Sequence, residues 1–158
     1  MREKTINYET IFFIKAIIVA WLCMASTCAM DYYNPLYLTN NSRQDLRFAF
    51  SDDNDTILPI EKIRGVTIKA LSTDGIAGGG AKWESVYKVN HPSGIMSLFI
   101  LSCDTLAKYP WEQVREDYNI LVRYDLRLQD LYKLDFKVVY PPSEAMKDMK
   151  MYPPYGSK

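Results

Sequence analysis

Short hydrophobic stretches, several of them alternating with polar residues, follow one another along this chain from residue 36 to residue 140. The alternation is clear where Leu46, Phe48 and Phe50 are separated by Arg47 and Ala49. A period of two places the two kinds of side chain on opposite faces of a half-buried β-strand. On this basis the chain is predicted to contain strands at 36–39, 46–50, 66–70, 83–89, 96–103, 120–124 and 136–140.

Residues 96–103 differ from the other stretches because they are hydrophobic almost throughout. A run without polar alternation predicts a strand that is covered on both faces, at the centre of a sheet. Two hairpins are expected from the turn-forming residues between strands. One has its turn at Asn40–Ser42, and the other at Asn90–Gly94.

Beyond residue 104 the hydrophobic spacing changes to three and four, which predicts two short helices in the C-terminal half. The first covers 109–115, with Pro110 in its first turn, where a missing backbone N–H costs little. Asp104–Thr105 is expected to cap this region. The second helix covers 126–134, with Leu128, Leu131 and Leu134 on one stripe.

These elements predict a mainly β protein, an antiparallel β-sandwich of immunoglobulin-like architecture with two short helices. The expected organisation is an export signal at 1–29, a single sandwich domain at 30–141 and a flexible, Pro-rich tail at 142–158. The glycine-rich stretch 72–81 is expected to be a flexible loop. A phosphate-binding loop would need a Lys-Ser/Thr pair at a helix start.

The N-terminal segment has the three parts of an export signal. Charged residues up to Lys15 precede the apolar core 16–25, and small residues follow. Cleavage after Ala29 would release a soluble product. Alternatively, Cys28 follows small residues and is a candidate for lipidation, although Ala25 stands where a lipoprotein signal has Leu, Val or Ile. An uncleaved signal anchor is the third reading, and the apolar run is short for one.

Composition and charge exclude several classes of function. The chain has 158 residues, of which 48% are hydrophobic, so it is not intrinsically disordered. Its 19 basic residues balance its 19 acidic residues, which argues against nucleic-acid binding. The only histidine, His91, is expected in a solvated turn, and Cys103 is expected to be a small buried residue on a strand. No metal site and no cofactor are predicted.

No catalytic residues are predicted, because the sequence lacks a nucleophile elbow, a His-Glu pair and a Cys-x-x-Cys motif. The alternative is a small hydrolase that uses paired carboxylates, for which Glu112, Glu116 and Asp117 are the nearest candidates. Such a pair needs one carboxyl group in an apolar pocket. The simpler interpretation of these three residues is a solvated helix face.

A recurrent set of short motifs runs through the second half of the chain: Asp104-Thr-Leu106, Tyr109-Pro-Trp-Glu112, Arg123-Tyr124, Leu128-Gln-Asp-Leu131 and Tyr140-Pro141. Together with Tyr37–Ser42, this pattern resembles that of small, uncharacterised envelope lipoproteins of Gram-negative gut anaerobes. The resemblance implies a secreted or lipid-anchored protein of unknown function, and it supplies no catalytic residues.

Two triplets, Asp55-Thr56-Ile57 and Asp104-Thr105-Leu106, are similar to the Asp-Ser/Thr-aliphatic signal for O-glycosylation of exported proteins in those bacteria. Thr56 and Thr105 are therefore candidate glycosylation sites. For Asp104–Thr105, a helix cap is the competing explanation.

Taken together, the sequence predicts an exported protein of the periplasm, outer membrane or cell surface. It is expected to be a non-catalytic binding or structural module whose partner is an envelope protein or a glycan. Tyrosine is abundant, with 12 residues, and offers contact surface for either partner. The clusters to inspect are Tyr32, Tyr33 and Tyr37, and Tyr152 with Tyr155. Contact with a membrane is expected only through a signal anchor or a lipid on Cys28.

Overall fold

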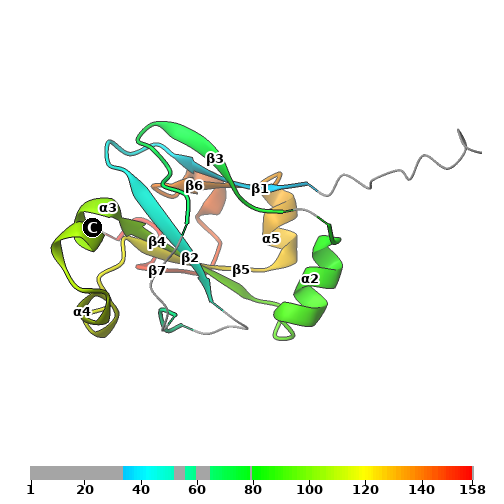
Figure 1. Cartoon of the computed structure of the whole chain (residues 1–158). Helices are drawn as coiled ribbons and strands as arrows, with labels where there is room; N and C mark the ends of the chain where they lie inside the picture. The colour runs from blue at the N-terminus through cyan, green and yellow to red at the C-terminus, as the bar shows by residue number, and fades with distance from the viewer. Residues whose placement is uncertain (1–33, 52–55, 60–64, 79, 158) are drawn as a thin grey trace, which may run out of the picture. The chain divides into compact units, whose positions relative to one another are not determined.

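The computed structural model describes residues 34–51, 56–59, 65–78 and 80–157. This part of the chain is mainly β, as predicted, with seven strands in two sheets and four short α-helices (Figure 1). It belongs to one compact unit, residues 32–158. The predicted export signal at 1–29, including Cys28, lies outside the described residues. No helix within the described ranges has the length and hydrophobicity needed to cross a membrane.

The strands form one sheet of three and one sheet of four. The first has the order β3-β1-β6, with strands Ser72–Ala77, Leu36–Asn40 and Lys137–Tyr140. The second has the order β2-β4-β5-β7, with strands Leu46–Ser51, Met96–Ser102, Val122–Leu126 and Met151–Tyr152. The prediction of purely antiparallel sheets is wrong for one pair, because β1 and β6 run parallel.

The main hydrophobic core joins the two sheets. Leu38 of β1 is fully buried in the same cluster as Leu98 of β4 and Tyr124 of β5. The neighbouring residue Phe99 points the other way from β4 and belongs to a second cluster. All seven residues of β4 are buried, so the prediction of a central strand covered on both faces is confirmed.

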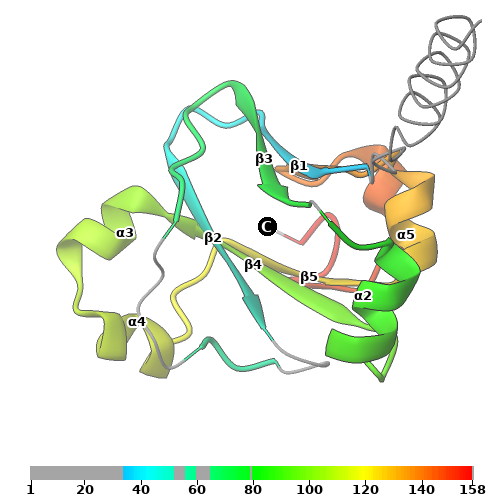
Figure 2. The ribbon, with the colours of Figure 1, turned by 45° about the vertical axis from the view of Figure 1, so that its right-hand side comes forward.

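Four helices cover the two ends of this unit: α2 at Trp83–Asn90, α3 at Cys103–Lys108, α4 at Trp111–Glu116 and α5 at Leu128–Lys133. Helices α2 and α5 lie side by side at one end, and α3 and α4 lie at the other (Figures 1 and 2). The two predicted C-terminal helices are confirmed as α4 and α5. Helix α3 was not predicted. It begins at Cys103 because the Ser102 hydroxyl accepts a hydrogen bond from the Asp104 N–H at 3.2 Å.

Two of the sequence predictions for this region are thereby wrong. Cys103 is a half-buried free thiol at the start of a helix, and not a buried residue on a strand. The cap is Ser102, and not Asp104–Thr105. Both errors have the same cause: the strand ends at Ser102, one residue earlier than expected, because the serine hydroxyl caps a helix that begins at Cys103.

The segment 83–89 forms helix α2, so the predicted strand and its hairpin with residues 96–103 are wrong. Trp83 and Tyr87, four residues apart, are the buried side chains, and Val89 is 75% exposed. In so short a segment, residues four apart lie on one face whether the segment is a helix or a strand, so this spacing does not distinguish the two. Glu84 in the first turn and Lys88 in the last turn suit the helix dipole.

The predicted first hairpin is also wrong, since β1 and β2 lie in different sheets. Residues 66–70 form no strand and contribute only one bridge, between Ile68 and Leu46. Strand β3 instead occupies 72–77, which was expected to be a flexible loop. The chain therefore changes sheet at the corner between Asn40 and Leu46.

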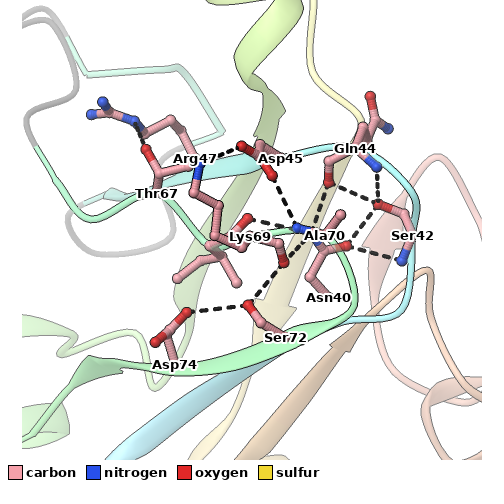
Figure 3. A network of polar contacts seen from close by, with 11 residues as sticks. Asn40, Ser42, Gln44, Asp45, Arg47, Thr67, Lys69, Ala70, Ser72 and Asp74 are labelled. Carbon is pink, nitrogen blue, oxygen red and sulfur yellow. Dashed lines mark hydrogen bonds and ion pairs between the residues drawn. The ribbon is translucent and has the colours of Figure 1, made fainter.

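Asn40 organises this corner (Figure 3). It is fully buried, and its amide nitrogen donates hydrogen bonds to the carbonyl oxygens of Gln44 at 2.8 Å and Lys69 at 2.9 Å. Its amide oxygen accepts hydrogen bonds from the N–H and the hydroxyl of Ser42. The side chain thus links the end of β1, the corner and the segment before β3.

Asp45 strengthens the same corner from its surface. Its carboxylate accepts a hydrogen bond from the Ala70 N–H at 3.0 Å and contacts the Lys69 ammonium at 2.8 Å (Figure 3). The hydrogen bond from Lys69 lowers the pKa of Asp45, and Asp45 in turn raises the pKa of Lys69.

We predict that Asn40→Asp destabilises the protein by about 2–4 kcal/mol, because a carboxylate cannot donate to the carbonyl oxygens of Gln44 and Lys69 and is itself buried. Urea denaturation followed by circular dichroism measures the loss. The matched control is Asn41→Asp, an exposed neighbour, which is expected to change stability by less than about 0.5 kcal/mol. Equal midpoints for the two variants would contradict the role given to Asn40.

The C-terminal segment packs into the core, which corrects the prediction of a flexible tail at 142–158. A 3-10 turn at Glu144–Met146 leads to β7, which pairs with β5. Met146, Met149 and Met151 belong to the main core cluster. The described residues beyond Met151 are exposed. The prolines stop regular structure locally, but the methionines between them still reach the core.

Candidate functional site

A pocket of about 290 Å³ lies beside α2, where the ends of β2 and β3 meet the start of β4. Its walls are mostly apolar, with a few polar side chains among them. The lining residues are Phe50, Ser51, Ala77, Gly78, Ala81, Trp83, Val86, Asn90, His91 and Met96. Apolar walls with a small number of polar groups are typical of sites for small ligands.

One face of α2 forms a wall of the pocket. Trp83, Val86 and Asn90 line it at the spacing of three and four that brings helical side chains together. The Trp83 indole N–H donates to the Asn34 carbonyl oxygen at 2.7 Å, and its ring lies 5.8 Å from that of Phe136. The polar atom of the indole is thereby satisfied outside the pocket, and the ring system is held in place.

The polar end of the pocket is built around His91. The prediction of a solvated turn histidine is wrong, since His91 is only 7% exposed. Its backbone N–H donates to the Tyr87 carbonyl oxygen at 3.0 Å, and its ring lies 5.4 Å from the Tyr87 ring. The turn after it closes through the Gly94 N–H, which donates to the His91 carbonyl oxygen at 2.7 Å, with Gly94 at a φ of 75°. This turn returns the chain at once to β4 and leaves His91 inside.

Tyr87 supports His91 from behind. It is buried, and its hydroxyl donates to the Leu126 carbonyl oxygen at 3.1 Å. A phenol is neutral at physiological pH with its ordinary pKa, and burial raises the pKa of Tyr87 further. The imidazole therefore rests against an uncharged aromatic ring.

Gly78, which also lines the pocket, comes directly after β3. It has a φ of 144°, and a Cβ atom at this position would lie 2.8 Å from the Cα atom of Pro35. Only glycine allows this close approach between the end of β3 and the chain that leads into β1. The glycine-rich stretch thus includes a packing contact beside the pocket.

The three carboxylates named as hydrolase candidates do not line this pocket. Glu112, Glu116 and Asp117 are exposed on and just after α4, at the opposite end of the unit from α2 (Figure 2). The buried side chains of α4 are Trp111 and Val114, so the helix turns its acidic face to solvent. None of the three lies in the apolar pocket in which a carboxylate hydrolase holds its general acid.

A buried carboxylate that the sequence analysis missed lies elsewhere, on β5. Asp125 is 2% exposed and accepts two hydrogen bonds from the Arg123 guanidinium, at 2.8 and 3.2 Å. Ser97 donates to it at 3.1 Å, and the Lys150 ammonium lies 3.4 Å away. The alternation Arg123-Tyr124-Asp125 could have indicated that the two charges share one face. This cluster holds strands and the C-terminal segment together.

Of the predicted tyrosine clusters, the described part is Tyr37, Tyr152 and Tyr155. Tyr37 is half-buried on β1, whereas Tyr152 and Tyr155 are exposed. The Tyr152 ring lies 5.6 Å from the Tyr118 ring and 5.8 Å from the Arg123 guanidinium. Tyr32 and Tyr33 lie outside the described residues.

The candidate glycosylation sites differ in accessibility. Thr56 is exposed and outside any helix or strand. Thr105 is half-buried within α3, and its carbonyl oxygen accepts a hydrogen bond from the Tyr109 N–H at 3.0 Å. Thr56 is thus the more accessible acceptor.

Within the described residues, no group of three or more His, Cys, Asp or Glu side chains is arranged to hold a metal ion. No family model, curated protein or solved structure matches the chain. The resemblance to envelope lipoproteins therefore stays a prediction, and function has to be inferred from the pocket itself.

Proposed function

We propose that this chain is an exported envelope protein and a non-catalytic binding module, whose two sheets stack as a β-sandwich of immunoglobulin-like architecture. Its partner is an envelope protein or a glycan, and the pocket beside α2 is in addition a binding site for a small ligand. The module needs no cofactor. Its balanced charge argues against nucleic acid as a partner.

The observation that carries this proposal is the chemistry of the pocket walls. Among the described lining residues, His91 is the one titratable side chain, and the others are apolar or neutral. Hydrolysis by paired carboxylates needs two such groups on either side of the scissile bond. A site with one imidazole and apolar walls favours binding.

The test is to incubate the purified protein with a glycan and peptide fraction of the envelope and to analyse what it retains by mass spectrometry. Retained molecules are expected to be chemically intact and to raise the melting temperature, because a ligand that binds only the folded state stabilises it. Cleaved products would favour the hydrolase alternative. If a Glu112→Gln, Glu116→Gln, Asp117→Asn variant still gave cleaved products, the three candidate carboxylates would be excluded as the catalytic groups.

Export is tested separately at the N-terminus. Mass spectrometry of the protein from its own cells is expected to show a mature chain that starts at a lipidated Cys28 or at Met30. A Cys28→Ser variant distinguishes these two cases, because it abolishes membrane attachment only if the lipid is the anchor. An intact Met1 would contradict cleavage. The same spectra show whether Thr56, the exposed candidate, carries a glycan while Thr105 does not.

A further inference from the structure

We propose that the pocket beside α2 binds a small, neutral, elongated molecule with an aromatic body of about two rings and one hydrogen-bonding head group. This inference rests on the binding function proposed above and specifies the ligand of that same site. The body lies against Trp83, and the head group lies at His91.

The pocket has two chemically different ends, set by the direction of α2. Trp83 stands at the start of the helix, and Asn90 and His91 stand at its end. Because a helix rises 1.5 Å per residue, Trp83 and Asn90 are about 10 Å apart along its axis. A molecule that contacts both ends must therefore be elongated.

The Trp83 end is suited to an aromatic body. Ala77 and Ala81 line the pocket with small side chains, and Val86, three residues after Trp83 on α2, adds to its apolar wall. The indole N–H is engaged by the Asn34 carbonyl oxygen, so the side chain offers the pocket an apolar aromatic surface. Flat rings pack well on such a surface.

The other end is suited to a hydrogen-bonding head group. His91 stands at this end, lines the pocket and is more than nine-tenths buried. Ser51 is a second buried polar residue of the lining, and its hydroxyl donates to the Ile57 carbonyl oxygen at 3.5 Å. Imidazole and hydroxyl groups can each donate and accept hydrogen bonds. The Tyr87 ring holds the imidazole in position at a distance of 5.4 Å. No Asp, Glu, Lys or Arg is among the described lining residues, which favours a neutral head group over a carboxylate or an ammonium.

The volume limits the size of the body. A fully apolar cavity of roughly 150 Å³ holds one benzene ring. At about 290 Å³, this pocket has space for two fused rings with a substituent, and a single tyrosine or phenylalanine side chain from a partner protein would leave much of it empty. A free small molecule is for this reason the expected occupant.

The probes are 2-naphthol, naphthalene and 2-naphthoate, titrated at pH 8 into the purified full-length protein labelled with ¹³C in its methionine methyl groups. Met96 lines the pocket, and its methyl resonance, assigned with Met96→Leu, reports occupancy. We expect saturable shifts with 2-naphthol, and binding of naphthalene and 2-naphthoate that is weaker by about threefold to tenfold for want of a neutral head group.

Two valines on α2 provide a matched pair of variants. Val86 lines the pocket, whereas Val89 is 75% exposed on the same helix and is not a lining residue. Val86→Phe is expected to weaken 2-naphthol binding at least tenfold, and Val89→Phe to leave it within twofold. Ala81→Phe fills the pocket from the exposed side and serves if Val86→Phe disturbs folding. His91→Phe is expected to remove the preference for 2-naphthol over naphthalene.

The proposal is overturned if 2-naphthol leaves the Met96 resonance unshifted up to its solubility limit, or if both valine variants bind it equally. If 2-naphthoate binds best, the assignment of a neutral head group is wrong. If His91→Phe keeps the preference for 2-naphthol, the placement of the head group is wrong. The envelope-fraction and N-terminus experiments do not use these probes, so failure of the ligand assignment and failure of the proposed function give separate results.

Discussion

Truncation of the chain after Pro142 is expected to leave a protein that is largely unfolded at room temperature. The deletion removes Met146, Met149 and Met151 from the core and strips β7 from the edge of β5. Burial of a methionine side chain contributes about 1.5–3 kcal/mol, so the three together contribute roughly 5–9 kcal/mol. That loss is comparable with the whole stability of a domain, which is about 5–15 kcal/mol.

Circular dichroism and urea denaturation of the truncated protein measure this effect. The matched control ends after Pro153, and the described residues that it lacks, 154–157, are all exposed, so its denaturation midpoint is expected to equal that of the full chain. Met146→Ala tests the same packing without a deletion and is expected to cost about 2–5 kcal/mol, since Met146 is fully buried. A truncated protein with an unchanged midpoint would show that the C-terminal segment does not stabilise the fold.

Replacement of Asp125 by alanine is expected to destabilise the protein by about 3–5 kcal/mol. The carboxylate is buried and is the shared partner of Arg123, Ser97 and Lys150. Its removal takes from the Arg123 guanidinium, whose side chain is 12% exposed, its two hydrogen bonds to a carboxylate and leaves it the neutral Tyr118 hydroxyl and the Thr56 carbonyl oxygen as partners. An uncompensated charge in such surroundings costs far more than the loss of a surface ion pair.

Urea denaturation measures this change too, with Asp148→Ala as the control, because Asp148 is an exposed aspartate of the same C-terminal segment that Lys150 belongs to. The control is expected to stay within about 0.5 kcal/mol of the original protein. The double variant Arg123→Leu, Asp125→Leu should be less destabilised than the sum of the single changes by about 0.5–3 kcal/mol, because neither charge is then left alone. Strict additivity would mean that the two residues act independently.

The spacing of hydrophobic residues was sufficient to predict a fully buried strand and two helices with one buried face. The continuous hydrophobic run of β4 led to a central strand, and the spacing around Trp111 and Leu131 led to α4 and α5. These predictions hold because hydrophobic periodicity reports directly which face of an element is buried.

The errors have a common physical origin. In the segment 83–89, the burial of Trp83 and Tyr87 suits either period, and only packing against α5 and the ends of the strands selects the helix. Tyr132 of α5 donates a hydrogen bond to Glu84, a contact between residues far apart in sequence. A local pattern carries no information about such partners.

The candidate site shows the same division. His91 could be found in the sequence as the single histidine, but its burial depends on the tight turn that sets α2 against β4. The pocket is made by four separate segments, and no spacing of residues along the chain marks their meeting. Sequence reasoning found no signal for it and assigned its α2 wall to a strand.

By itself, the sequence determined the mainly β character, the central strand and the two C-terminal helices, because the burial pattern of each is written in consecutive residues. Tertiary structure alone decided which strands pair, that residues 83–90 coil beside the strand ends, that the C-terminal methionines enter the core, and that His91 and Trp83 face one cavity. The reason is that these features depend on the free energy of contacts between distant segments, which outweighs the small local preferences of each.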